Sequence, residues 1–143
     1  MAIYFYSVLE PFGEFSNFSP HPIVIDGQRW STTEHYFQAQ KFNDAAYKDK
    51  IRSASTPKRA AELGRSRSMP LRVEWESEKD EVMYRAVRAK FEQHAELKTL
   101  LLSTDAEEIV ENAPGDYYWG CGKDGCGKNM LGQILVRVRE ELK

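Results

Sequence analysis

The sequence predicts an α+β fold, with a single, mostly helical domain and a few short strands over residues 1–143. Segments with apolar residues at helical spacing cover most of the chain. Strand candidates are short and lie at the start and near residue 110, and they do not alternate with helices as in βαβ proteins. A chain of 143 residues has room for one hydrophobic core.

The strand candidates are residues 3–6, a hairpin, and an edge strand at Glu108–Glu111. The hairpin joins Ile23–Ile25 to Gln28–Trp30, because the Asp-Gly pair between them supplies the positive φ of a tight turn. The segment between the first strand and the hairpin, PFGEFSNFSPHP, is rich in Gly, Pro, Ser, Asn and aromatic residues. It is therefore expected to be a loop.

Helix start signals divide the middle of the chain. Ser31 and Glu34 have the spacing of a capping box, and residues 31–42 contain no Gly or Pro, which predicts a helix there. Thr56 followed by proline predicts a helix that ends at Gly64. The other helices are expected at residues 45–53, 77–94 and 96–102, and from Asn129 onward.

Two of these helices have a clear apolar face. In residues 77–94 the buried face should carry Met83, Val87 and Phe91, with charged i,i+4 pairs opposite. In the last helix the apolar positions follow the helical period, and they are Leu131, Ile134, Leu135, Val138 and Leu142.

Composition excludes several classes of protein. The net charge is −2, from 20 basic and 22 acidic residues, which argues against a broad basic face that binds nucleic acid. No apolar run is long enough to span a membrane, and the N-terminal segment does not have the pattern of a secretory signal, so we expect a cytoplasmic protein. Cys121 and Cys126 are expected to be free thiols, because two cysteines with no nearby His cannot complete a zinc site.

The stretch WGCGKDGCGKN, residues 119–129, contains G-x-x-x-x-G-K and resembles a phosphate-binding P-loop. No buried strand precedes it, no strand ending in Asp follows, and Asn129 stands where Ser or Thr would hold magnesium, so an NTPase is excluded. Two interpretations remain. The glycines form a turn with Asn129 as an N-cap, or the amides of Gly127 and Lys128 bind an anion at the helix start while Trp119 stacks on a ring.

The helix at residues 31–42 has an unusual polar face. Glu34, Phe37, Gln38 and Lys41 share one side, and buried polar groups there need partners or a ligand. Glu34 is either the third residue of a capping box or a catalytic carboxylate that faces a cleft. His35 lies about 100° round the helix, which argues against a His–Glu dyad.

Other residues also have two interpretations. Asn17, between Phe15 and Phe18, can hold a ligand hydroxyl or its own turn. Trp75 is a core anchor or a stacking platform. Arg65 meets a phosphate or belongs to a solvated turn, and Lys41 binds an anion or is a solvated end.

Five segments in this order resemble the YbiA-like, or NADAR, family: FSNF, WSTTEHYFQAQKF, the run from LGRSRS to PLRVEW, VMYRAVRAKFEQH, and DYYWG followed by GKNMLG. The resemblance covers nearly the whole chain. It implies the YbiA-like fold and an N-glycosidase that needs no metal or redox cofactor. Such an enzyme hydrolyses a bond between ribose C1 and a nitrogen.

The resemblance also assigns roles to residues. Glu34 matches the catalytic glutamate of the W-x-x-x-E-H motif, and Asp116 is the candidate to hold ribose hydroxyls or to assist protonation. The substrate-binding residues that we expect are Asn17, Lys41, Arg65, Trp75, Trp119, Gly120, Gly127 and Asn129. One departure is Cys121, where we expect a polar or acidic residue in close relatives, and Cys126 is unexpected as well.

The resemblance implies a small-molecule substrate and no obligate protein partner. The expected substrates are phosphoribosylamino-pyrimidine intermediates of riboflavin biosynthesis. The alternative is ADP-ribosylated guanine, in which case nucleic acid is met only as a modified-base substrate. Competing classes are a non-catalytic module that binds ADP-ribose or a nucleotide, which would not need Glu34, and a plain helical interaction domain.

Overall fold

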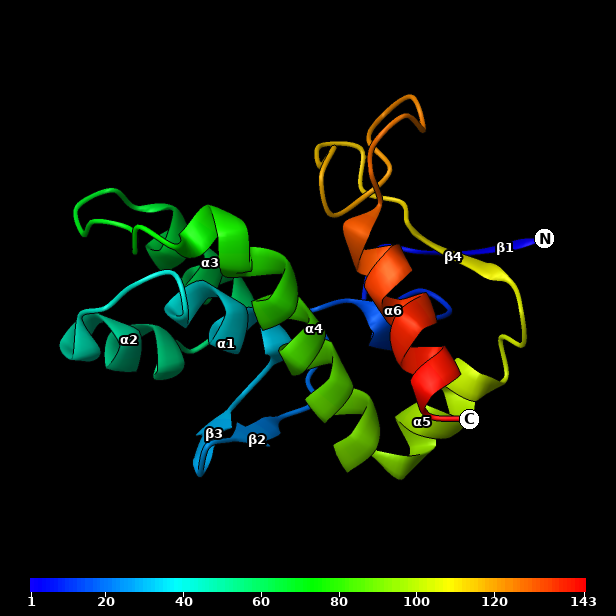
Figure 1. The fold of residues 1–143 in the computed structure, drawn as a ribbon, viewed down its shortest axis with the longest axis horizontal. Coiled ribbons are helices and arrows are strands. Elements are labelled where there is room, and N and C mark those ends of the chain that lie inside the picture. Colours follow the sequence, from blue (N-terminus) through cyan, green and yellow to red (C-terminus); the bar gives the residue numbers. More distant parts are fainter.

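A computed structural model describes all residues, 1–143. Its elements follow in the order β1 (Ala2–Phe5), a 3-10 turn (Gly13–Phe15), β2 (Ile23–Ile25), β3 (Gln28–Trp30), α1 (Thr33–Ala39), α2 (Ala45–Arg52), α3 (Pro57–Arg65), α4 (Trp75–Gln93), α5 (Ala95–Leu102), β4 (Glu108–Glu111) and α6 (Met130–Glu141). The long helix α4 crosses the middle of the molecule, with α1, α2 and α3 on one side and β1, β4 and α6 on the other (Figure 1). The predicted α+β, mostly helical fold is confirmed.

The strands form two separate two-stranded sheets. In the first, β1 runs parallel to β4, with Ala2 opposite Glu108 and Phe5 opposite Glu111. In the second, β2 and β3 form the predicted hairpin, and its two turn residues both have positive φ. The edge strand near residue 110 therefore has a partner from the opposite end of the chain, and α6 packs against it.

The core is a cluster of 26 buried side chains. From α4, Met83, Val87 and Phe91 are at most 2 % exposed, and from α6, Leu131 and Leu135 are fully buried. The apolar faces predicted for both helices are confirmed. Because each such side chain contributes about 1.5–3 kcal/mol when buried, the packing of α4 against α6 is a major part of the framework.

The start of α1 differs from the prediction by one residue. Thr32, not Ser31, is the N-cap, and its hydroxyl oxygen accepts a hydrogen bond from the His35 amide at 3.1 Å. The predicted capping box is therefore wrong, and the side chain of Glu34 is free to point elsewhere. The His35 ring bonds to Thr32 and to the carbonyl oxygen of Ala54, so no His–Glu dyad forms.

Two other helix ends differ from the prediction. The first helix was expected to reach residue 42, but it ends at Ala39, and Arg72 donates hydrogen bonds to the carbonyl oxygens of the two residues that follow, Gln40 and Lys41, both at 2.8 Å. The longest helix begins at Trp75 instead of Ser77, whose hydroxyl donates to a preceding carbonyl.

None of the helices combines the length and the apolar composition that a membrane span requires.

Candidate active site

A cavity of about 470 Å³ lies between the two sides of the molecule. One wall comes from α1 and α3, and the other from the end of β4 and the loop that follows it. The 3-10 turn and its following loop contribute the floor through Ser16 and Asn17, and Tyr6 and Phe18 are exposed lining residues. The cavity is within the roughly 300–1,000 Å³ that small-molecule sites occupy.

Glu34 lines this cavity from the first turn of α1 and is 9 % exposed. One carboxylate oxygen accepts a hydrogen bond from the Gln38 amide at 2.7 Å, one helical turn further on. Burial raises the pKa of Glu34, whereas the hydrogen bond from Gln38 and the charges of Lys41 and Arg65 oppose that rise. The carboxylate therefore lies in a site that is largely shielded from water and that it shares with two cations, and it does not cap the helix.

Gln38 has a second feature that points to a ligand or to tight packing. The side chain is 6 % exposed, and its Oε1 has no hydrogen-bond partner. A Cβ added to Gly64 would overlap that oxygen, so the glycine allows α3 to approach α1 closely. Gln38 was recognised in the sequence only as part of the polar face, and its contact with Glu34 follows from their i,i+4 spacing.

Asn17 lies beside Glu34 and is held on three sides. Its side-chain oxygen accepts from the Thr33 hydroxyl at 2.8 Å, its amide lies 3.3 Å from the sulfur of Met83, and its carbonyl accepts from the Glu34 amide at 3.2 Å. Beneath this loop, the buried Lys90 ammonium donates to the carbonyl of the preceding residue at 2.9 Å. The Asn17 amide is therefore presented to the cavity in a fixed orientation.

Lys41 and Arg65 supply positive charge to the cavity wall. Burial lowers the pKa of Lys41 to about 8, against the influence of Glu34, which raises it. The Lys41 ammonium lies 5.8 Å from the centre of the Phe37 ring. Both cations were predicted as substrate-binding residues, and the fold brings them to the same cavity as Glu34.

Two further carboxyl groups line the opposite wall. Asp116 uses Oδ1 to accept from the amides of Tyr118 and Trp119, at 3.0 and 2.8 Å, so it organises its own turn. Glu111 ends β4, and burial, followed by the charges of Asp116 and Glu34, raises its pKa to about 7. Sequence reasoning placed Glu111 only in an edge strand, and nothing in its local sequence distinguishes it from Glu108.

The two predicted tryptophans have different positions. Trp119 lines the cavity, and its ring meets Phe37 edge-on at 5.3 Å between centres. Trp75 is 5 % exposed and contacts Phe37 from the core, at 5.1 Å between centres, without lining the cavity. The structure thus gives Trp75 the core-anchor position and leaves Trp119 as the tryptophan that can meet a ligand.

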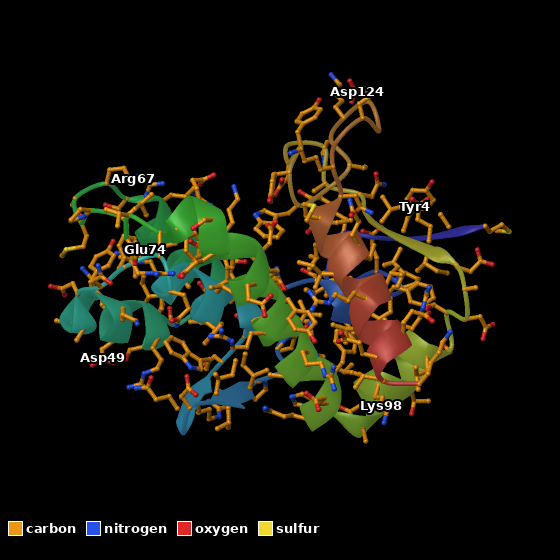
Figure 2. All side chains as sticks on the ribbon, viewed as in Figure 1. Tyr4, Asp49, Arg67, Glu74, Lys98 and Asp124 are labelled. Atoms are coloured by element: carbon orange, nitrogen blue, oxygen red, sulfur yellow. The ribbon has the colours of Figure 1, made fainter.

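The glycine loop does not join this cavity. Gly127 and Asn129 line a separate hollow of about 460 Å³, and Gly120 packs against Ala113 and the Glu111 carbonyl. Figure 2 shows Asp124 at the tip of the loop, away from the helices. Of the predicted substrate-binding residues, Trp75, Gly120, Gly127 and Asn129 are therefore not brought to the Glu34 cavity.

Asn129 stands at the N-cap position of α6, as one of the two interpretations of the sequence predicted, but it does not cap the helix through its side chain. Its backbone is left-handed, with φ of 52°, and its side chain does not cap α6. The side-chain oxygen instead accepts from the Glu111 amide at 2.9 Å, and the side-chain amide donates to the Ile109 carbonyl at 2.8 Å. Asn129 therefore connects the start of α6 to β4. In this way it fixes the backbone of Glu111, which lines the Glu34 cavity, although Asn129 does not line that cavity itself.

The two cysteines lie in the same loop and are free thiols, as predicted. Cys121 is buried, with its sulfur 3.4 Å from the Asn112 side-chain oxygen, and Cys126 is exposed. Neither lines the Glu34 cavity. No group of three or more His, Cys, Asp or Glu side chains is arranged to hold a metal ion.

The chain is similar to several known proteins. It is 55 % identical to N-glycosidase YbiA of Escherichia coli over 140 residues, which cover 98 % of this chain and 88 % of that protein. It is 49 % identical to N-glycosidase Npun_R5314 of Nostoc punctiforme, with 100 % and 94 % covered. The NMR structure of E. coli YbiA matches with a TM-score of 0.93 and 54 % identity, over 99 % of this chain and 84 % of the other.

The fold and the carboxylate-lined cavity, taken with these relatives, define an N-glycosidase, which is a hydrolase of N-glycosyl bonds. The model of the NADAR domain matches residues 4–143. The chain belongs to the NADAR family.

Proposed function

We propose that the enzyme hydrolyses the ribose C1–N bond of phosphoribosylamino-pyrimidine intermediates of riboflavin biosynthesis, with Glu34 as the catalytic carboxylate. The observation that carries this proposal is the buried Glu34 carboxylate, which lines one cavity together with Lys41 and Arg65. A site of this kind can accept a sugar phosphate and place a negative charge beside its reacting carbon.

Glu34 suits the chemistry of the bond. Cleavage of an N-glycosidic bond develops positive charge on the ribose, as in other glycoside hydrolysis. A carboxylate in a site shielded from water stabilises that charge more strongly than one in bulk solvent. We assign Glu34 to stabilise the charge at C1 and to take a proton from the attacking water. The hydrogen bond from Gln38 holds its carboxylate in place for both roles.

The remaining contacts fit the other parts of such a substrate. The 5′-phosphate would lie at Lys41 and Arg65, where charge-assisted hydrogen bonds are available. Trp119 offers a ring face to the pyrimidine. Asn17, and the Asp116 carboxylate oxygen that does not accept from the turn amides, would hold ribose hydroxyls.

The names of more distant relatives agree with this substrate class. The chain is 42 % identical over 141 residues to riboflavin biosynthesis protein VVA0006 of Vibrio vulnificus, which covers 99 % of this chain and 38 % of that protein. It is 41 % identical over 155 residues to the chloroplastic riboflavin biosynthesis protein PYRR of Zea mays, which covers 98 % of this chain and 25 % of that protein. In both, the matching part is one segment of a longer chain.

The test compares wild type with Glu34→Gln, and Glu62→Gln is the control because it changes an exposed glutamate on α3. Each protein is given 5-amino-6-ribosylaminouracil 5′-phosphate and, separately, an ADP-ribosylated guanine oligonucleotide. Mass spectrometry follows the released base and sugar. We expect wild type and the control to cleave the first substrate, and Glu34→Gln to lose about 10²–10⁴-fold in kcat/KM.

Other outcomes would redirect the assignment. Cleavage of only the oligonucleotide would move the function to an ADP-ribosyl-guanine hydrolase of the same family. Equal activity of wild type and Glu34→Gln would remove Glu34 from the mechanism. Tight binding without turnover by folded wild-type protein would leave a non-catalytic binding module.

A further inference from the structure

Three carboxyl groups line the cavity, and the structure distinguishes them by their hydrogen bonds. Glu34 accepts from the Gln38 amide. Asp116 accepts from two backbone amides. The Glu111 carboxyl forms neither a hydrogen bond nor an ion pair with the protein, although most of its surface is shielded from water. It is therefore the carboxyl whose two oxygens are both free to form a hydrogen bond with a ligand.

The backbone of Glu111 is fixed on both sides. Its amide donates to the Asn129 side chain at 2.9 Å, and its carbonyl accepts from the Cys121 amide at 2.9 Å. Strand pairing places its Cα opposite that of Phe5. Because the backbone of Glu111 is fixed, its carboxyl group can reach only a limited region of the cavity. A group that transfers a proton to one particular atom needs such a restricted position.

The charges around Glu111 are arranged asymmetrically. Asp116 from the following loop and Glu34 from α1 are the negative groups that disfavour ionisation of Glu111, after burial itself, and its pKa is about 7. Lys41 and Arg65 line the cavity on the side of α1 and α3, together with Glu34, and Tyr6 is the other titratable group in the lining. A carboxyl pair with different environments is the usual basis for an acid and a base in one site.

We propose that Glu111 is a second catalytic residue, which donates the proton to the exocyclic amino nitrogen of the pyrimidine as the ribose C1–N bond breaks. This inference rests on the proposed function. It gives the reaction the acid that a poor nitrogen leaving group needs, at a position on the wall opposite Glu34.

The step balances as follows. The C1–N bond breaks and its electron pair stays on nitrogen, which takes the proton of the Glu111 carboxyl. The oxygen of a water molecule bonds to C1, and one of its protons passes to the Glu34 carboxylate. The products are ribose phosphate and the free amine, and the two carboxyls have exchanged protonation states. Proton exchange with solvent restores both.

The test is the pH dependence of kcat for wild type, Glu111→Gln and Glu111→Asp, with 5-amino-6-ribosylaminouracil 5′-phosphate as substrate. The matched control is Glu108→Gln, an exposed glutamate on the same strand. Wild type should lose activity as pH rises through about 7, because Glu111 then loses the proton that it must donate. Glu111→Gln should lower kcat by about 10²–10³-fold and abolish this alkaline decline.

Glu111→Asp keeps a carboxyl group at the site, so it distinguishes the loss of the proton donor from a general defect in folding. We expect it to be slower than wild type but to retain an alkaline decline, and all variants should bind substrate with unchanged KM. The role of Glu111 would be overturned if the kcat of Glu111→Gln stayed within about twofold of the wild-type value. It would also be overturned if Glu111→Gln kept the alkaline decline in kcat. If wild type cleaves neither proposed substrate, the proposed function fails, and the role of Glu111 with it.

Discussion

Lys41 is a partly buried ammonium group beside Glu34, and burial lowers its pKa to about 8. A charge in this setting attracts a phosphate strongly because little water competes with it. The same burial means that the charge is lost at mildly alkaline pH. The binding of a phosphorylated substrate should therefore depend on pH through this one residue.

We predict that Lys41→Met raises KM for the phosphorylated substrate by about tenfold or more, the loss expected for one charge-assisted contact, with a smaller effect on kcat. In wild type, KM should rise above pH 8 as Lys41 loses its proton. Steady-state kinetics from pH 6 to 9 would measure both effects, with Lys50→Met on the exposed face of α2 as control. A KM that stays flat across pH 8 would remove Lys41 from phosphate binding.

On the scale of helices, α1 and α3 pack closely where Gly64 meets the Gln38 side chain. Alanine is favoured over glycine within a helix by about 1 kcal/mol. Here the added methyl group would overlap Gln38, and overpacking of this kind costs about 1–3 kcal/mol. The steric cost exceeds the gain in helix propensity, and relief requires Gln38 to move away from Glu34.

We therefore predict that Gly64→Ala lowers the free energy of unfolding by about 1–2 kcal/mol and also lowers kcat. Urea denaturation measures the first effect and turnover the second. Gly115→Ala is the stability control, because a Cβ there meets nothing within 4 Å. A Gly64→Ala protein that is more stable than wild type would show that Gln38 has room to move.

The sequence predicted elements better than their junctions. The helices α4 and α6 were recognisable because their apolar faces repeat at helical spacing. Asn129 is at the N-cap position, but the expected capping bond does not form because its side chain bonds to β4, a tertiary contact that no local pattern contains. The residues just after α1 are also held by a tertiary contact, since Arg72, far along the chain, donates to the Gln40 carbonyl.

The residues of the candidate site also divide into those that a local sequence pattern identifies and those that only the tertiary structure places. Glu34 and Lys41 were singled out because the predicted helix places them on one face, which is a local pattern, and the family resemblance then assigned their roles. Glu111 was missed because its position at the cavity depends on the pairing of β4 with β1. The glycine loop offered the signals of a phosphate site, but the fold turns Gly127 toward another hollow.

At the scale of the whole molecule, Lys90 links stability to pH. It is 1 % exposed, and burial lowers its pKa from near 10.5 to about 7. Between these two values the unfolded chain holds a proton that the folded chain has released, so the free energy of unfolding rises with pH. Below pH 7 both states are protonated, and the folded state bears the full cost of the buried charge.

We predict that wild-type stability rises from pH 7 to 9.5 and that Lys90→Met makes this rise smaller. The slope is the quantity to compare, because Lys90→Met also leaves the Ser16 carbonyl without its donor. Urea denaturation at several pH values gives the slope, and Lys98→Met, an exposed change on α5, is the control. An unchanged slope in Lys90→Met would mean that Lys90 stays protonated in the fold.

The parallel pairing of β1 with β4 has a consequence for biosynthesis. Because β1 is synthesised before β4, it has no partner until residues 108–111 have been added, and its backbone groups cannot form these ladder hydrogen bonds before then. Contacts between residues so distant in sequence form slowly, because the entropy of closing a long loop is lost before the contacts stabilise the chain. Since that closure also brings Glu111 to Glu34, the nascent chain has no assembled cavity until β4 has been made.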